Sequence, residues 1–224
     1  MLVHVKNVTR DFIQGEITVH ALRGIDLEIS EGEFTALVGP SGSGKTTLLN
    51  CIGVLDVPTD GEIFFQNEPM AALKGKDISD FRLHKLGFIF QAYNLIPVFT
   101  ALENVEYILT LQKVDKKSRR ERALAVLKDM GLESLQNRFP RELSGGQQQR
   151  VAVARALVSK PALILADEPT ANLDTENAEK LLDLMGMMSE NLKTTFLFST
   201  HDERVMKRAH RIVHLLDGKI TNEK

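Results

Sequence analysis

Apolar and polar positions alternate along this chain with two different periods. Over the first ninety residues, short runs rich in β-branched and aromatic residues are separated by turns, which is typical of β-strands. These runs cover residues 2–8, 19–29, 34–38, 61–65 and 87–91. From about residue 93 to residue 160 the apolar positions recur three and four apart, which predicts helices at 102–112 and 119–130.

After residue 160 the pattern returns to alternating strands and helices. Strands are expected at 162–166 and 195–199 with a helix at 177–189 between them, and a last helix and a hairpin follow. The helical middle therefore interrupts an α/β protein. We expect a single domain over residues 1–224, in which 1–92 and 161–224 form a core with a β subdomain and 93–160 form an inserted helical subdomain.

Composition narrows the class of protein. The formal net charge is −2, so no overall positive field points to a nucleic-acid partner. No apolar run approaches the roughly 18 residues of a membrane span, and the first twelve residues lack the apolar core of a signal peptide. A single cysteine, Cys51, excludes an intrachain disulfide and fits a reducing compartment, where its expected role is small apolar filler.

A glycine-rich segment follows one of the predicted strands directly. Residues 39–47 read Gly-Pro-Ser-Gly-Ser-Gly-Lys-Thr-Thr, between the strand at 34–38 and apolar residues at helical spacing. Strand, glycine loop and helix in this order form a P-loop, in which backbone N–H groups and a helix N-terminus surround phosphates. Lys45 would supply a charge for the β- and γ-phosphates, and Thr46 a hydroxyl for Mg²⁺. The candidate phosphate-binding residues are Gly39, Pro40, Ser41, Gly42, Ser43, Gly44, Lys45, Thr46 and Thr47.

Two acids end a strongly apolar strand further along the chain. Asp167 and Glu168 follow the sequence Leu-Ile-Leu-Ala and precede Pro169, which stops the strand. Asp167 is placed to hold the Mg²⁺ shell, as the acid after a buried strand of a P-loop protein does. Glu168 is the candidate general base that polarises the attacking water. Apolar residues followed by Asp-Glu would alone be weak evidence for these two roles. Together with the upstream P-loop, the evidence is strong.

A second motif lies about a hundred residues after the P-loop. Residues 143–147 read Leu-Ser-Gly-Gly-Gln and open a predicted helix. A P-loop followed by this motif resembles the nucleotide-binding subunit of an ATP-binding-cassette (ABC) machine, and the resemblance covers essentially the whole chain. It implies a P-loop NTPase core with an antiparallel β subdomain and an inserted α-helical subdomain, which binds ATP with Mg²⁺ and hydrolyses it.

The resemblance assigns roles to four further positions. Gln91 would reach Mg²⁺ or the water, the alternative being a polar strand cap, and His201 would donate to the γ-phosphate. Phe12 would stack on adenine, where the family more often has Tyr, and a core phenylalanine is the alternative. Asn-Leu-Asp at 172–174, ending in Asp174, resembles the loop that crosses the dimer interface.

The Leu-Ser-Gly-Gly-Gln motif implies a homodimer. In the family geometry Ser144, Gly145, Gly146 and Gln147 form a second anion cradle that faces the nucleotide of the other protomer. The Ser144 hydroxyl and the N–H groups of the two glycines would bind the anion. A helix that we expect to start near Gln147 would add the positive end of its dipole. Two chains would then enclose two ATP molecules, each cradle completing the partner's site.

Three stretches resemble the branch of the family that serves lipoprotein release and macrolide export: residues 14–22, residues 93–105 and the glutamine tract within 143–150. In that branch a separate membrane permease subunit docks near Gln91–Val105, so the chain would be cytoplasmic and peripheral on the cytoplasmic face of the inner or plasma membrane. An apolar groove would be lined by Leu95, Ile96, Val98 and Phe99, of which we expect at least two to pack inside the helical subdomain instead.

Two alternatives remain open. The basic cluster at residues 113–122 is interpreted as a solvated loop and first helical turn, with contact to anionic lipid headgroups as the lesser alternative. The cassette could also belong to a regulatory ATPase that gates a cell-division or sensor membrane complex without moving substrate. A DNA-repair role is disfavoured because the chain has no long coiled-coil insertion.

Overall fold

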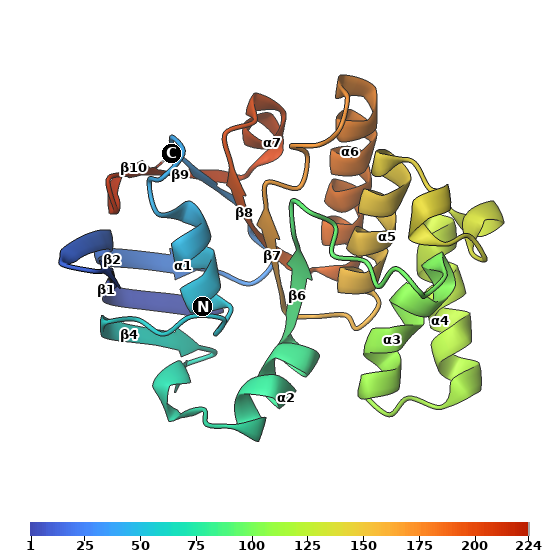
Figure 1. Cartoon of the computed structure of the whole chain (residues 1–224), viewed down its shortest axis with the longest axis horizontal. Coiled ribbons are helices and arrows are strands. Elements are labelled where there is room, and N and C mark those ends of the chain that lie inside the picture. The colour runs from blue at the N-terminus through green and yellow to red at the C-terminus, as the bar shows by residue number, and fades with distance from the viewer. Residues whose placement is uncertain (224) are drawn as a thin grey trace. The chain divides into compact units, whose positions relative to one another are not determined.

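The computed structural model describes residues 1–223 and divides the chain into two compact units. The first unit comprises Met1–Arg82 and Thr195–Lys224, and the second comprises Leu83–Thr194. Figure 1 labels their elements, and each unit is described by itself below. The boundaries of the helical subdomain expected at residues 93 and 160 stay a prediction.

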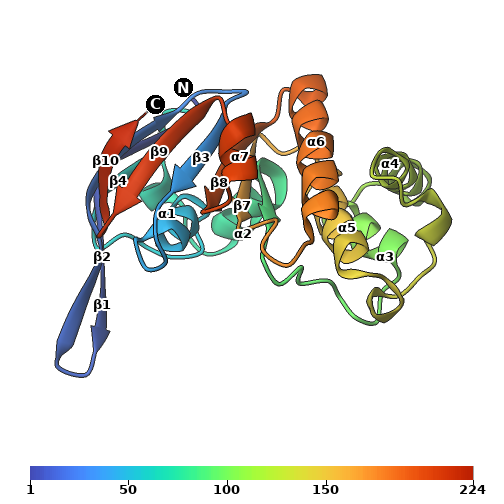
Figure 2. The same cartoon turned by 90° about the horizontal axis from the view of Figure 1, so that it is seen from above.

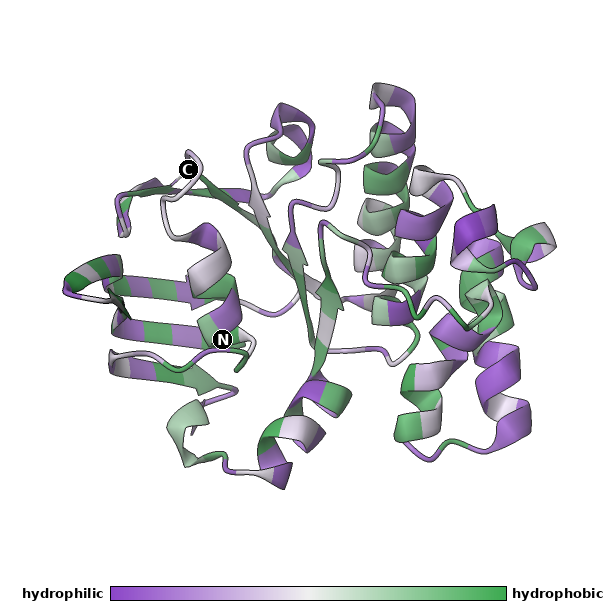
Figure 3. Cartoon of the chain, in the orientation of Figure 1, coloured by the Kyte–Doolittle hydropathy of each residue, from purple (hydrophilic) through white to green (hydrophobic). Residues whose placement is uncertain are grey.

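The first unit contains a four-stranded antiparallel sheet, which confirms the expected β subdomain. Its strands run in the order β2-β1-β4-β5, with bounds Ile17–Ile29 for β2, Val3–Gln14 for β1, Asp60–Phe65 for β4 and Glu68–Pro69 for β5. Val3 is opposite Ile29 on one side and Phe65 on the other, and all three are buried. Polar and apolar residues alternate along β1 and β2 (Figure 3), as expected for a sheet with one solvated face.

Strands β1 and β2 continue beyond β4 as a hairpin whose end projects from the sheet (Figure 2). The sequence predicted strand only up to residue 8 and again from residue 19, so the stretch at 14–22 is a more regular structure than expected. Backbone pairing carries the strands to Gln14 and Ile17, and Gly15 turns the chain with a positive φ of 63°. Ile13 is 80% exposed and Ile17 is 68% exposed, so burial does not stabilise this end.

The first unit also contains parallel strands. β3 (Phe34–Val38) lies between β8 (Thr195–Thr200) and β9 (Arg211–Leu216), and β9 pairs antiparallel with β10 (Lys219–Glu223). Four of the five residues of β3 and all six of β8 are buried, as the continuous apolar runs predicted. Helix α1 (Lys45–Ile52) follows β3, and α7 (Glu203–Arg208) follows β8. The carboxyl ends of β3 and β8 are neighbours, because Val38 is paired with Thr200.

One helix was not predicted. Helix α2 (Lys76–Lys85) follows a short 3₁₀ turn, η1 (Met70–Ala72). All ten residues of α2 are at least partly exposed. Apolar periodicity cannot reveal a helix that buries no apolar stripe.

The second unit is mainly helical. Strand β6 (Leu86–Ile89) pairs parallel with β7 (Leu163–Asp167). The helices are α3 (Ala101–Leu111), α4 (Lys116–Asp129), α5 (Gly145–Leu157) and α6 (Thr175–Leu192), with 3₁₀ turns η2 (Glu133–Leu135) and η3 (Pro140–Glu142). Helix α5 packs beside β6 and the other three helices of this unit (Figure 1). Val151, Ala152, Val153 and Ala154 of α5 are buried.

The loop before α3 is fixed by a buried amide. Asn104 is fully buried, accepts a hydrogen bond from the Ile96 N–H at 2.8 Å and donates to the Ile96 and Phe99 carbonyls at 3.1 Å each. In this loop Leu95, Ile96 and Phe99 are partly buried and Val98 is 74% exposed. We expected at least two of these four side chains to pack inside the helical subdomain, and three of them are only partly buried. Among residues 1–223, no helix is long and apolar enough to cross a membrane.

Candidate nucleotide-binding and catalytic residues

The loop between β3 and α1 has the backbone geometry of a phosphate cradle. Gly44 caps α1 with a φ of 105°, and a Cβ at this position would lie 2.6 Å from the Ala21 carbonyl oxygen. A Cβ at Gly39 would lie 2.0 Å from the Leu215 carbonyl oxygen. Gly42 also has a positive φ, 80°, but has open space around it. Gly39 and Gly44 therefore let other backbone segments approach the loop closely. Gly42 provides a left-handed turn where the loop has open space around it.

Lys45 and Ser43 are buried within this loop. The Lys45 ammonium donates to the Gly39 carbonyl at 2.8 Å and to the Pro40 carbonyl at 3.0 Å, and the residue is only 7% exposed. The Ser43 hydroxyl is buried and has no hydrogen-bond partner among the described residues. Thr46 is exposed in the first turn of α1, and Thr47 is partly buried.

These features fit a polyphosphate. A buried hydroxyl without a partner, a lysine held in the loop, and the N-terminal N–H groups of α1 are all groups that bind phosphate oxygens. For Mg²⁺, the donor set expected from the sequence is the Thr46 hydroxyl, the Gln91 amide and the Asp167 carboxylate. All three donate oxygen atoms, which are the ligands that this hard cation prefers.

Phe12 lies near the end of β1 and is partly buried. The Arg10 guanidinium lies over its ring, 4.5 Å from the centroid. Two hydrogen bonds to Asp56 hold that guanidinium, Nε to Oδ2 at 2.9 Å and Nη2 to Oδ1 at 2.7 Å. A fixed cation over one face orients the aromatic ring.

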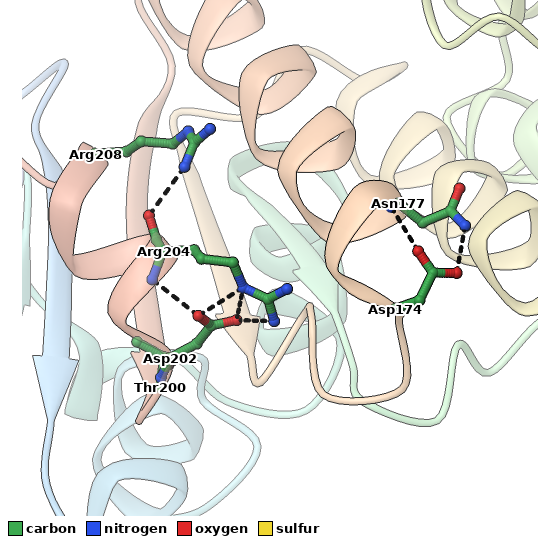
Figure 4. Close-up of polar contacts among 6 residues, drawn as sticks. All are labelled: Asp174, Asn177, Thr200, Asp202, Arg204 and Arg208. Atoms are coloured by element: carbon green, nitrogen blue, oxygen red, sulfur yellow. Dashed lines mark hydrogen bonds and ion pairs between the residues drawn. The ribbon is translucent and has the colours of Figure 1, made fainter.

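His201 follows β8 directly and is exposed. The turn after it is rigid, since the Asp202 N–H donates to the Thr200 hydroxyl at 3.0 Å and the Asp202 carboxylate caps α7 (Figure 4). The Arg204 guanidinium donates to both carboxylate oxygens of Asp202, at 2.9 and 2.7 Å. Because β3 and β8 pair in parallel register, the phosphate loop and His201 leave the same edge of the sheet.

The two candidate acids lie at the end of β7 in the second unit. Asp167 is the last residue of β7, and Glu168 follows with a φ of 46°. This left-handed conformation is uncommon for a residue with a side chain. The next residue is held by the fully buried Gln149 of α5, whose amide donates to the Pro169 carbonyl at 2.8 Å. The turn that carries Glu168 is therefore attached to the helix of the Leu-Ser-Gly-Gly-Gln motif.

That helix begins earlier than the sequence suggested. Ser144 is the N-cap and α5 starts at Gly145, whereas we expected the start near Gln147. The earlier start results from a capping box, which the serine–glutamine spacing could have revealed. Both glycines leave little room for a side chain, since a Cβ at Gly145 would lie 2.9 Å from the Tyr93 hydroxyl and one at Gly146 would lie 3.1 Å from the Asn177 side chain.

Asp174 is the N-cap of α6. Its carboxylate accepts from the Asn177 backbone N–H at 2.9 Å and from the Asn177 side-chain amide at 2.7 Å (Figure 4). The backbone hydrogen bond from Asn177, followed by the side-chain one, lowers the pKa of Asp174. Because Asn177 also packs against Gly146, the structure brings the N-terminal ends of α5 and α6 together.

Gln91 is exposed two residues after the end of β6. Its backbone carbonyl accepts a hydrogen bond from the Asn172 amide at 2.9 Å. The segment at 172–174 is thus connected to the segment at Gln91.

Sequence reasoning missed three residues that hold these groups in place, Arg10, Gln149 and Asn177, and it gave no sign of the contact between Asn172 and Gln91. Only Asn177 carried a local signal, because it stands three residues after the capping Asp174. The others act on residues distant in the chain, so their partners depend on the tertiary fold.

A P-loop joined to a parallel sheet, with an Asp-Glu pair ending another buried strand, defines a P-loop nucleoside triphosphatase. The comparisons make the class more specific. Residues 22–171 match the family model described as ABC transporter. An uncharacterised ABC transporter ATP-binding protein of Methanocaldococcus jannaschii, MJ0796, is 45% identical over 226 residues, covering 99% of this chain and 96% of that protein. The lipoprotein-releasing system ATP-binding protein LolD of Bacteroides thetaiotaomicron is 45% identical over 222 residues, covering 99% and 100%.

Solved structures agree over the whole chain. The dimeric structure of MJ0796 superimposes with a TM-score of 0.93 at 44% identity, covering 100% of this chain and 98% of that one. A dimeric post-hydrolysis state of MJ0796 bound to ADP and Pi gives a TM-score of 0.93 at 45% identity, with the same coverage. The chain belongs to the ABC transporter family and is an ATP-binding, ATP-hydrolysing subunit of that family.

Proposed function

We propose that this chain drives a separate membrane permease through ATP-dependent dimerisation, in a system of the lipoprotein-release or macrolide-export type. The observation that carries the proposal is one chain with both a complete P-loop and a capped Leu-Ser-Gly-Gly-Gln helix. The 45% identity with the lipoprotein-releasing LolD protein over nearly the full length supports the branch.

In the proposed site, the residues of the first unit bind the nucleotide. Phe12 stacks on the adenine, and residues 39–47 surround the phosphates. Lys45 is held by loop carbonyls 2.8 and 3.0 Å away, and its charge would act on the β- and γ-phosphates. His201 would donate to the γ-phosphate.

The residues of the second unit would supply the hydrolytic chemistry. Asp167 and Gln91, with Thr46 of the first unit, would hold Mg²⁺, which when bound neutralises charge on the phosphates. Glu168 would accept a proton from the attacking water. Its left-handed backbone, with a φ of 46°, is the kind of local strain that often accompanies a functional residue.

The motif residues would act on the nucleotide of a second copy. Ser144 would offer its hydroxyl, Gly145 and Gly146 their N–H groups, and Gln147 would keep the helix end formed, while Asp174 would lie at the interface. The dimeric state of MJ0796, at 44% identity, supports this arrangement.

The permease would dock at the segment from Gln91 to Val105, which would make the chain peripheral on the cytoplasmic face of the membrane. Val98, which is 74% exposed, supports a contact at this segment. The loop that presents it is already ordered by Asn104, so docking would cost little conformational entropy.

Dimerisation tests the proposal directly. Glu168→Gln keeps the shape of the side chain but cannot accept a proton, so this variant should bind ATP and fail to hydrolyse it. With saturating Mg-ATP it should elute as a dimer in size-exclusion chromatography with light scattering, whereas the wild type without nucleotide should be a monomer. The matched control is Glu168→Gln with Lys45→Ala, which should stay monomeric. A Glu168→Gln variant that binds Mg-ATP and remains a monomer would contradict the proposal.

A further inference from the structure

The segment that follows Gln91 has a strained backbone. Tyr93 and Asn94 are consecutive residues with positive φ, 55° and 48°. The Asn94 N–H donates to the Ala92 carbonyl at 2.5 Å, which closes a three-residue turn around Tyr93. A left-handed conformation is unfavourable for a tyrosine, so surrounding groups must hold it.

Arg155 provides that support. It lies in the last turn of α5, and its guanidinium donates from Nη1 to the Asn94 carbonyl at 2.6 Å and from Nη2 to the Tyr93 carbonyl at 2.9 Å. Desolvation lowers the pKa of Arg155. The planar guanidinium reaches both carbonyls of the strained pair at once, which a lysine ammonium does less well.

Two more contacts connect the same segment to the rest of the second unit. The Asn172 amide donates to the Gln91 carbonyl at 2.9 Å. The Tyr93 hydroxyl lies against Gly145, where a Cβ would come within 2.9 Å of it. Residues 91–94 therefore contact both the start of α5 and the loop that follows Glu168.

We propose that Arg155 is a positioning residue for hydrolysis, which holds the strained turn at Tyr93–Asn94 and thereby fixes Gln91 and the start of helix α5. This rests on the proposed role of Gln91 in the hydrolytic site. Arg155 would not touch the nucleotide, and its effect would pass through the backbone that it holds. Loss of Arg155 should then slow the chemical step while nucleotide affinity is kept.

Kinetics and binding separate these effects. Arg155→Met should lower kcat by about 10- to 100-fold, as displacement of a positioned group does, with the Kd for ATP within about twofold of the wild type. Arg155→Lys should be intermediate. The matched control is Arg122→Met, which removes a guanidinium bond of 2.8 Å to the Val158 carbonyl at the end of the same helix. It should lose thermal stability as Arg155→Met does and keep kcat.

A rescue tests the strain itself. Glycine adopts positive φ without steric cost, so Asn94→Gly should restore part of the kcat lost in Arg155→Met. A double variant no more active than Arg155→Met would overturn the strain argument.

A readout independent of hydrolysis comes from the two tyrosines of the chain, Tyr93 and Tyr107. With 3-fluorotyrosine the protein should give two ¹⁹F resonances, assigned with Tyr107→Phe. Arg155→Met should shift or broaden the Tyr93 resonance and leave that of Tyr107 unchanged. An unchanged Tyr93 resonance together with wild-type kcat would overturn the inference.

If the wild type itself failed to hydrolyse ATP, the proposed function would fail, whereas the ¹⁹F result would still test the role of Arg155 in holding the turn.

Discussion

Ser144 and Gln147 cap the start of α5 reciprocally. The Ser144 N–H donates to the Gln147 side-chain oxygen at 2.9 Å, and the Gln147 N–H donates to the Ser144 hydroxyl at 3.3 Å. The sequence predicts that both residues are parts of a cradle for the partner's nucleotide. The structure adds a role within their own chain, because a capping box satisfies N–H groups that would otherwise lack partners.

This dual role shapes the prediction for Ser144→Arg. The variant should leave the ATP affinity of the isolated chain near that of the wild type and block ATP-dependent dimerisation through bulk and charge. It should also lower the free energy of unfolding by about 1 kcal/mol, because the cap is lost. Isothermal titration, light scattering and denaturant unfolding measure the three quantities. Gln147→Ala is the control, since it breaks the box without adding charge. ATP binding weakened as severely as in Lys45→Ala would count against action on the partner's site.

Lys45→Ala should abolish Mg²⁺-dependent ATP hydrolysis, with a loss of about 100-fold or more, because its charge is used at the transferring phosphoryl group. Phosphate release at saturating ATP provides the measurement. Lys180→Ala is a suitable control, since that lysine is exposed on α6 and pairs with Glu176 one turn before it. Substantial hydrolysis by Lys45→Ala would refute the assignment of the phosphate loop.

Phe12→Leu should raise the Kd for ATP about tenfold, because stacking of a base on an aromatic ring contributes about 1–3 kcal/mol. Phe12→Tyr should bind as the wild type does, since the ring face is retained. Fluorescence titration with an ATP analogue labelled on the ribose would measure both. Equal affinity of the leucine variant and the wild type would show that Phe12 is a packing residue only.

The stability of the protein should fall at alkaline pH through Cys51. Burial, with a smaller contribution from Asp56, raises the pKa of Cys51 from 9.0 to about 12. Below pH 9 the thiol is protonated in both the folded and the unfolded state. Between pH 9 and about pH 12 only the unfolded state loses the proton, so the free energy of unfolding decreases as the pH rises.

Cys51→Ala isolates this effect. The difference in unfolding free energy between the wild type and Cys51→Ala, measured by denaturant titration, should be constant up to about pH 9 and should then shift against the wild type. If this difference in unfolding free energy stayed constant up to pH 11, the buried thiol would not be the source of the loss of stability at alkaline pH. Consistent with burial, Cys51 is 2% exposed and should react with thiol reagents only after unfolding.

Strands and helices with an apolar pattern were predictable because burial selects residues locally. The continuous apolar runs at β3, β7 and β8 and the amphipathic helix α3 were found close to their actual bounds. Helix α2 was missed because it buries no apolar stripe, and the end of the β1–β2 hairpin was missed because backbone pairing rather than burial forms it.

The sequence by itself determined the fold class and selected the candidate reactive groups. A glycine loop after an apolar strand, and two acids after another, are local patterns whose chemistry depends on residue type and spacing. Only the tertiary structure decided how those groups are held. Arg155 supports the turn at Tyr93 and Asn94 from 61 residues away, and Gln149 holds Pro169 from 20 residues away. Such contacts form when separate elements pack together, and a buried side chain then satisfies whichever carbonyl the packing places beside it.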